Sequence, residues 1–145
     1  MPLMIYPPST PVTQACVVEA ARVTDVPLAA LAGILRAEGG KVGMSHRNSN
    51  GTVDFGPMQI NSVWLPVLAQ AGVTSSMLLY NGCVNVLVGA WILRWEIALH
   101  DQSLWAGIEA YHSATPPLAR QYQIHVYRAL ARTKNLKEVV NAANP

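Results

Sequence analysis

The chain has 145 residues, a length typical of one domain with a sizeable hydrophobic core. Charged residues make up 12% of it and hydrophobic residues 51%, which excludes a disordered chain and favours a helix-rich globule. The net charge of +2 suits an anionic polymer but lacks the basic stripe of a nucleic-acid-binding protein, so we expect no nucleic acid partner.

The first predicted helix starts near the N-terminus. Thr10 can cap a helix that has Pro11 at its first position and extends to about Thr24. Residues 1–11, which hold four of the ten prolines, lack the apolar core of a secretory signal. We therefore expect either an exported protein whose signal is missing from this sequence, or a cytoplasmic one.

The second predicted helix begins after Asp25 and ends at Glu38, before Gly39 and Gly40. Residues 41–55 are polar, and Asn50-Gly51 is a strong signal for a two-residue β-hairpin turn. Further helices are predicted over 62–71, 83–100, 103–112 and 115–133.

The predicted organisation is a mainly α (α+β) fold with a small β-hairpin beside a cleft. We expect an N-terminal extension over 1–13, one domain over 14–133 and a peripheral tail over 134–145. No residue from Phe55 to Leu93 is charged, but prolines and amides interrupt this stretch. No apolar run therefore approaches the ~20 residues of a membrane span, and we expect a protein without one.

The only two cysteines are Cys16 and Cys83, each on or beside an apolar predicted helix. A disulfide between them would close a long loop and stabilise the fold by about 4 kcal/mol in the chain-entropy model. We favour this bridge, and with it an oxidising compartment, over the alternative of two buried free thiols.

Glu38 lies seven residues after Leu31 and four after Ile34, so it shares their inward helical face. A carboxyl held against apolar side chains favours its protonated form, which a general acid needs to protonate a leaving oxygen. The alternative is a helix-terminal glutamate turned to solvent.

Asp54 follows the predicted hairpin in a setting rich in asparagine, which should keep it ionised. An ionised carboxylate opposite a protonated one is the arrangement that glycosidic bond cleavage requires. The alternative is an Asx-turn residue that binds its own backbone. In Met58-Gln59-Ile60-Asn61 apolar and amide side chains alternate, so one side can pack while the other offers amides to a sugar.

These residues carry a resemblance to a known family. Glu38 followed by Asn48-x-Asn50-Gly51-x-x-Asp54-x-Gly56-x-Met58-Gln59-Ile60-Asn61-x-x-Trp64 resembles the goose-type-lysozyme-like lytic transglycosylase domain. Within that family the chain is most similar to the small enzymes encoded with type III and type IV secretion, conjugation and pilus systems. The pattern around the aspartate also resembles c-type lysozyme. Three further matches are Cys83-x-Asn85-x-x-Val88-Gly89-Ala90-Trp91-Ile92-Leu93, Ala110-Tyr111-His112 and Tyr122.

The resemblance implies a peptidoglycan lytic transglycosylase in the periplasm. Glu38 would protonate the oxygen between N-acetylmuramic acid and N-acetylglucosamine, then act as base on the C6 hydroxyl to leave a 1,6-anhydro end. Tyr111 would orient Glu38 by a hydrogen bond, and Met58, Gln59, Asn61, His112 and Tyr122 would line the sugar site. The implied partners are glycan strands and components of a secretion, conjugation or pilus machine.

Two departures bear on this expectation. Gly39 replaces the serine that usually follows the glutamate, and His112 replaces the asparagine that usually follows the tyrosine. The histidines are scattered without metal-ligand spacing, and we expect no metal, no cofactor and a monomer. The alternatives are a lysozyme-type hydrolase that uses Glu38 and Asp54, a non-catalytic glycan-binding scaffold, and, less favoured, a cytoplasmic helical bundle.

Overall fold

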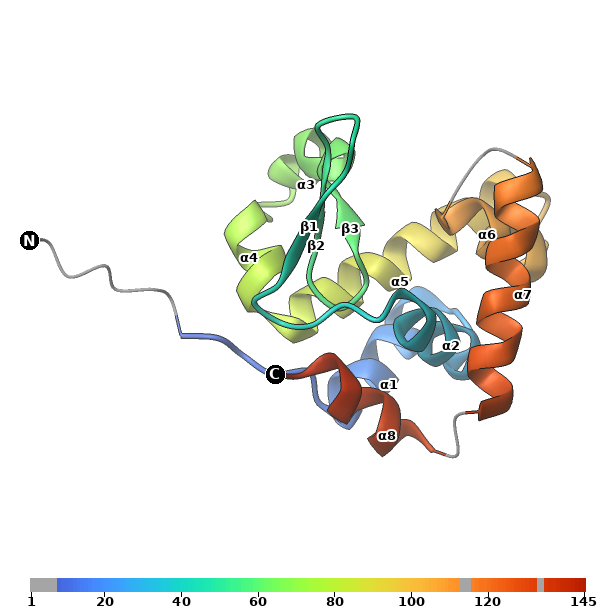
Figure 1. The fold of residues 1–145 in the computed structure, drawn as a ribbon, viewed down its shortest axis with the longest axis horizontal. Coiled ribbons are helices and arrows are strands. Elements are labelled where there is room, and N and C mark those ends of the chain that lie inside the picture. Colours follow the sequence, from blue (N-terminus) through green and yellow to red (C-terminus); the bar gives the residue numbers. More distant parts are fainter. Residues whose placement is uncertain (1–7, 113–115, 133–134) are drawn as a thin grey trace, which may run out of the picture.

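The computed structural model describes residues 8–112, 116–132 and 135–145. It is mainly helical, with a small sheet beside the short helices α3 and α4 and the long helix α5 extending from there towards α6 (Figure 1). The helices are α1 (Gln14–Thr24), α2 (Leu28–Glu38), α3 (Leu65–Gln70), α4 (Ser75–Tyr80), α5 (Gly82–Leu99), α6 (Leu104–His112), α7 (Pro116–Arg132) and α8 (Leu136–Ala143). This arrangement confirms the predicted fold class.

Helix α1 begins three residues later than we predicted, and its cap is Thr13 rather than Thr10. The Thr13 hydroxyl accepts a hydrogen bond from the backbone N–H of Cys16 at 3.1 Å. The backbone of Thr10 instead pairs with the turn between α4 and α5, donating to Tyr80 and accepting from Gly82, each at 2.8 Å. An extended segment that is paired in this way cannot also enter the first helical turn.

The predicted disulfide joins Cys16 and Cys83 and so links α1 to the start of α5. The two Cα atoms are 5.6 Å apart, a normal separation for a bridge. This cross-link holds together the two segments on which the helical core is assembled.

The predicted hairpin is present but belongs to a three-stranded antiparallel sheet. Its strands are β1 (Ser45–Arg47), β2 (Val53–Phe55) and β3 (Ile60–Asn61). The turn between β1 and β2 includes Gly51 at φ 86°, a conformation that glycine adopts without steric cost. In the register Asp54 lies opposite His46 on one side and Asn61 on the other.

The segment after the sheet differs from the prediction of one helix over 62–71. It forms a 3-10 turn over Ser62–Trp64 and the short helix α3, and a further helix, α4, follows. The N-cap of α4 is Thr74, whose hydroxyl accepts from the backbone N–H of Met77 at 3.2 Å. A helix of six residues is too short for its periodicity to be recognised in the sequence.

Helix α5 is the center of the core and packs against α1, α4 and α6. Its mean hydropathy of 1.4 over 18 residues would suit a membrane span by length and composition, yet half of the helix is buried inside the fold, as in the core helix of a globular domain. On α5 the buried Asn85 donates to the carbonyls of Phe55 and Leu78 and accepts from the backbone N–H of Met58. One asparagine therefore ties the sheet to the core.

The C-terminal segment is not the peripheral tail that we predicted. It contains α8, which is capped by Asn135 and buries Val139, Val140 and Ala143 against α2 and α1. After it, the Asn144 side chain exchanges hydrogen bonds of 2.8 and 3.0 Å with the backbone of Val12. The amphipathic spacing of α8 explains this packing, since its apolar residues share one face.

Candidate active site

A cleft of about 930 Å³ separates the sheet from the helical part of the molecule. Five of the predicted site residues line it together with Glu38, from β2, β3, the turn between them, and α6. The lining residues are Glu38, Asn48, Ser49, Asn50, Thr52, Asp54, Gln59, Ile60, Asn61, Val63, Trp64, Ile92, Glu96, Ala110, Tyr111 and His112.

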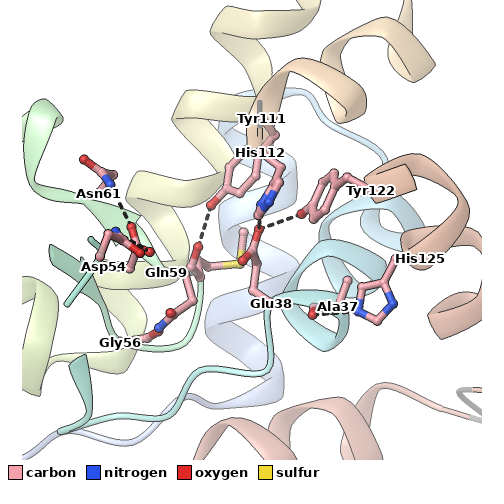
Figure 2. Close-up of polar contacts among 12 residues, drawn as sticks. Ala37, Glu38, Asp54, Gly56, Gln59, Asn61, Tyr111, His112, Tyr122 and His125 are labelled. Carbon is pink, nitrogen blue, oxygen red and sulfur yellow. Dashed lines mark hydrogen bonds and ion pairs between the residues drawn. The ribbon is translucent and has the colours of Figure 1, made fainter. Parts of the chain in front are cut away.

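Glu38 is the last residue of α2, and the buried Ile34 and Leu35 precede it on the same face. Only 9% of its side chain is exposed, so it points inward as the helical spacing predicted. Its Oε1 accepts a hydrogen bond from the Tyr122 hydroxyl at 2.8 Å, and the Nδ1 atom of His112 lies 3.7 Å from the same oxygen. Figure 2 shows the carboxyl between these two side chains. The solvent-facing alternative for Glu38 is therefore excluded.

The prediction that Tyr111 orients Glu38 by a hydrogen bond is wrong in this structure. The Tyr111 hydroxyl donates to the backbone carbonyl of Met58 at 2.9 Å, and Tyr122 from α7 makes the contact with Glu38. Burial raises the pKa of both tyrosines well above its usual value. Both hydroxyls therefore remain protonated and serve as hydrogen-bond donors.

Asp54 lies on β2, on the sheet side of the cleft (Figure 2). Its Oδ2 accepts from the side-chain amide of Asn48 at 3.0 Å, and its Oδ1 accepts from that of Asn61 at 2.9 Å. Two amide donors stabilise a carboxylate and hold it in one orientation. This arrangement replaces the Asx-turn alternative, since the bonds come from neighbouring strands and the loop.

Apolar and amide side chains alternate over residues 58–61 as predicted, but Met58 and Asn61 make contacts within the protein. Met58 and Ile60 are fully buried, and Met58 packs against Gly89 and is not among the residues that line the cleft. Asn61 uses its amide to hold Asp54 and its carbonyl oxygen to accept from the backbone of Val63. Both are supports of the site in this structure.

Gln59 keeps its place on the cleft wall. It has a φ of 52°, unusual for a residue other than glycine, and its amide donates to the carbonyl of Gly56 at 2.9 Å. Gly40 lies close to this bend. A Cβ added at Gly40 would lie only 2.7 Å from the amide nitrogen of Gln59. The loop after Glu38 and the turn before β3 therefore fix each other's position.

Sequence reasoning missed Glu96, which lies on α5 and lines the same cleft. Its side chain is 16% exposed, and burial raises its pKa above the usual value. Trp64 lines the cleft nearby and contacts Trp91 and Trp95 edge-on, with ring centroids 5.8 and 5.2 Å away. The available signal was the helical spacing of Glu96 four residues after the buried Ile92.

Comparison with known proteins identifies the family. Over 77 residues the chain is 36% identical to the invasion protein IagB of Salmonella typhimurium, a match that covers 53% of this chain and 48% of IagB. Over 89 residues it is 29% identical to the protein IpgF of Shigella flexneri, covering 59% of this chain and 58% of IpgF. The chain thus spans about half the length of these curated relatives. The profile described as "Transglycosylase SLT domain" matches residues 15–129, and the chain therefore belongs to the transglycosylase SLT domain family.

Proposed function

We propose that the protein is a peptidoglycan lytic transglycosylase that cleaves the β-1,4 bond between N-acetylmuramic acid and N-acetylglucosamine. The observation that carries the proposal is Glu38, a carboxyl 9% exposed, on the wall of a cleft large enough for several sugar units. Membership of the transglycosylase SLT domain family supports the same reaction.

The reaction needs one proton donor that later becomes a base. Glu38 gives its proton to the glycosidic oxygen, the bond from that oxygen to C1 breaks, and positive charge develops on the sugar ring. The resulting carboxylate of Glu38 then takes the proton of the C6 hydroxyl, whose oxygen bonds to C1. No water is consumed, and the product ends in a 1,6-anhydro ring.

The surroundings of Glu38 suit both steps. Tyr122 holds one carboxyl oxygen by a hydrogen bond, which fixes the orientation of the group relative to the cleft. Asp54 lines the same cleft as a carboxylate held by two amides, in a place where it can stabilise the developing positive charge.

Asp54 also supports a second candidate, hydrolysis as in c-type lysozyme. In that reaction Asp54 would form or stabilise an intermediate that water then resolves, and the products would carry reducing ends. We favour the transglycosylase because the match to its family extends through residue 129, well beyond the sheet that carries Asp54.

Mass spectrometry of digested peptidoglycan tests the proposal. Anhydro muropeptides, one water lighter than lysozyme products, are the expected result. Reducing-end muropeptides would establish the hydrolase, and a chain that binds glycan strands without releasing fragments would be a scaffold.

The similarity to a protein named as an invasion protein supports a cellular role in wall opening for a secretion, conjugation or pilus apparatus. The disulfide favours an oxidising compartment, and the substrate lies outside the cytoplasm, so we propose a periplasmic location. We also propose that the enzyme acts as a monomer. Fractionation of cells that express the full gene, with detection of the protein in the periplasmic fraction, checks this placement.

A further inference from the structure

His112, the last residue of α6, is held in a defined orientation beside Glu38. Its ring stacks on Tyr122 with centroids 4.5 Å apart and planes 11° from parallel. Its Nδ1 atom lies 3.7 Å from Oε1 of Glu38, the oxygen that also accepts from the Tyr122 hydroxyl at 2.8 Å. His112 and Tyr122 therefore contact the same oxygen of the Glu38 carboxyl (Figure 2).

The charges around His112 favour its protonated form. The Glu38 carboxylate raises the pKa of the imidazole above its usual value, the charge of Asp54 adds to this effect, and partial burial opposes it. The other titratable groups that face this region are Tyr111 on α6, Glu96 on α5, and Tyr122 and His125 on α7. Of these only His125 can carry a positive charge.

We propose that His112 is a positioning residue for Glu38, an inference that rests on the proposed function. Together with Tyr122, His112 holds Oε1 of Glu38 and leaves Oε2 to carry the proton that is given to the glycan. The imidazolium keeps its own proton throughout. The proton on Oε2 passes to the glycosidic oxygen, and a proton returns to Glu38 from the C6 hydroxyl. The imidazolium stabilises the carboxylate that exists between these two transfers.

This role has a consequence for the pH dependence with a definite sign. An adjacent cation favours the carboxylate over the carboxylic acid that the first step requires. Replacing His112 by asparagine removes this positive charge and therefore moves the alkaline limb of the pH–rate profile to higher pH. The maximal rate falls because Glu38 loses a contact that holds Oε1. Because the His112 side chain is half exposed, solvent reduces the size of this displacement.

Two matched measurements test the inference. His112→Asn is compared with His125→Asn, since His125 contacts the Ala37 carbonyl at 3.1 Å in the neighbouring hollow. Only His112→Asn should move the alkaline limb, with kcat reduced about 3-fold to 10-fold and KM little changed. An alkaline limb that stays in place in His112→Asn would overturn the positioning role.

The second measurement does not depend on catalysis. The imidazole resonances of His112 are followed by NMR against pH in the unaltered protein and in Glu38→Gln. Loss of the carboxylate should lower the titration midpoint of His112, because the Glu38 carboxylate raises the pKa of its imidazole. An unchanged His112 midpoint would disprove the contact itself. Failure of the unaltered protein to digest peptidoglycan, with the His112–Glu38 coupling intact, would instead disprove the proposed function and with it the positioning role in catalysis.

Discussion

Tyr122 of α7 donates its hydroxyl hydrogen to Glu38 of α2 at 2.8 Å, across 84 positions of the sequence. The contact depends on the packing of α2 against α7, so the candidate acid is oriented by tertiary structure rather than by its own helix. The tyrosine is 6% exposed, which keeps the hydrogen bond away from competing water.

Tyr122→Phe tests this relationship. A hydrogen bond to a charged group contributes about 1.5–3 kcal/mol, so its removal should lower kcat by about 10-fold to 100-fold with little change in KM. Steady-state digestion of purified peptidoglycan measures the effect. Tyr127→Phe on the same helix is the control, since Tyr127 is 64% exposed and should tolerate the change. Equal rates for the two variants would show that Tyr122 does not orient the acid.

Glu38→Gln should retain the fold and lose the reaction. Glutamine is nearly isosteric and still accepts from Tyr122, but it cannot donate the proton, so we expect at least a ~10³-fold loss of muropeptide release. Circular dichroism and cooperative thermal unfolding check that the fold is intact. Glu19→Gln, on the exposed face of α1, should digest at the unaltered rate. Substantial activity in Glu38→Gln would remove Glu38 from the mechanism.

The inward position of Glu38 followed from local spacing, because Leu31, Ile34 and Glu38 lie on one helical face. The hydrogen-bond donor to Glu38 could not be predicted in this way, since the choice between Tyr111 and Tyr122 depends on how α6 and α7 cross. Orientation of that kind is a property of packing and has no local signature.

Other differences had a signal in the sequence. Helix α8 carries Leu136, Val139, Val140 and Ala143 at amphipathic spacing behind the cap Asn135, so its burial was open to prediction. The strand β3 lies within the alternating segment 58–61, but its two residues were too few for a third strand to be predicted. Asn61 was expected to face a sugar, but its amide binds Asp54 because the register places the two side chains opposite each other.

The disulfide between Cys16 and Cys83 should contribute strongly to stability. Closing a loop of 67 residues lowers the entropy of the unfolded chain, an effect of about 4 kcal/mol at 25 °C. Urea unfolding with and without a reductant measures it, and the Cys16→Ser/Cys83→Ser double variant should be insensitive to the reductant. A loss below about 1 kcal/mol would mean that the reduced chain keeps most of its constraints.

Asn85→Asp should destabilise the link between sheet and core. The new oxygen would face the carbonyls of Phe55 and Leu78 where the amide now donates, at a cost of about 3 kcal/mol or more. We expect the loss to shrink at low pH, because a protonated aspartic acid can again donate. Urea unfolding at pH 4 and pH 7 measures this, with Asn141→Asp on the exposed side of α8 as control. A pH-independent loss would contradict the hydrogen-bond explanation.

Asp54→Asn separates the two candidate reactions. Asparagine keeps the size of the side chain but removes the negative charge that we expect to stabilise the developing cation. If Glu38 acts with the C6 hydroxyl alone, the variant should be slower by about 10-fold to 100-fold while its muropeptides still end in the 1,6-anhydro ring. If Asp54 is an essential partner, the loss should approach that of Glu38→Gln, and the unaltered enzyme should release reducing ends. Asn61→Ala serves as an intermediate case, because it removes one of the two amides that hold Asp54 and leaves the charge. A smaller loss in Asn61→Ala than in Asp54→Asn, with unchanged products in both, would identify Asp54 as an electrostatic helper rather than a nucleophile.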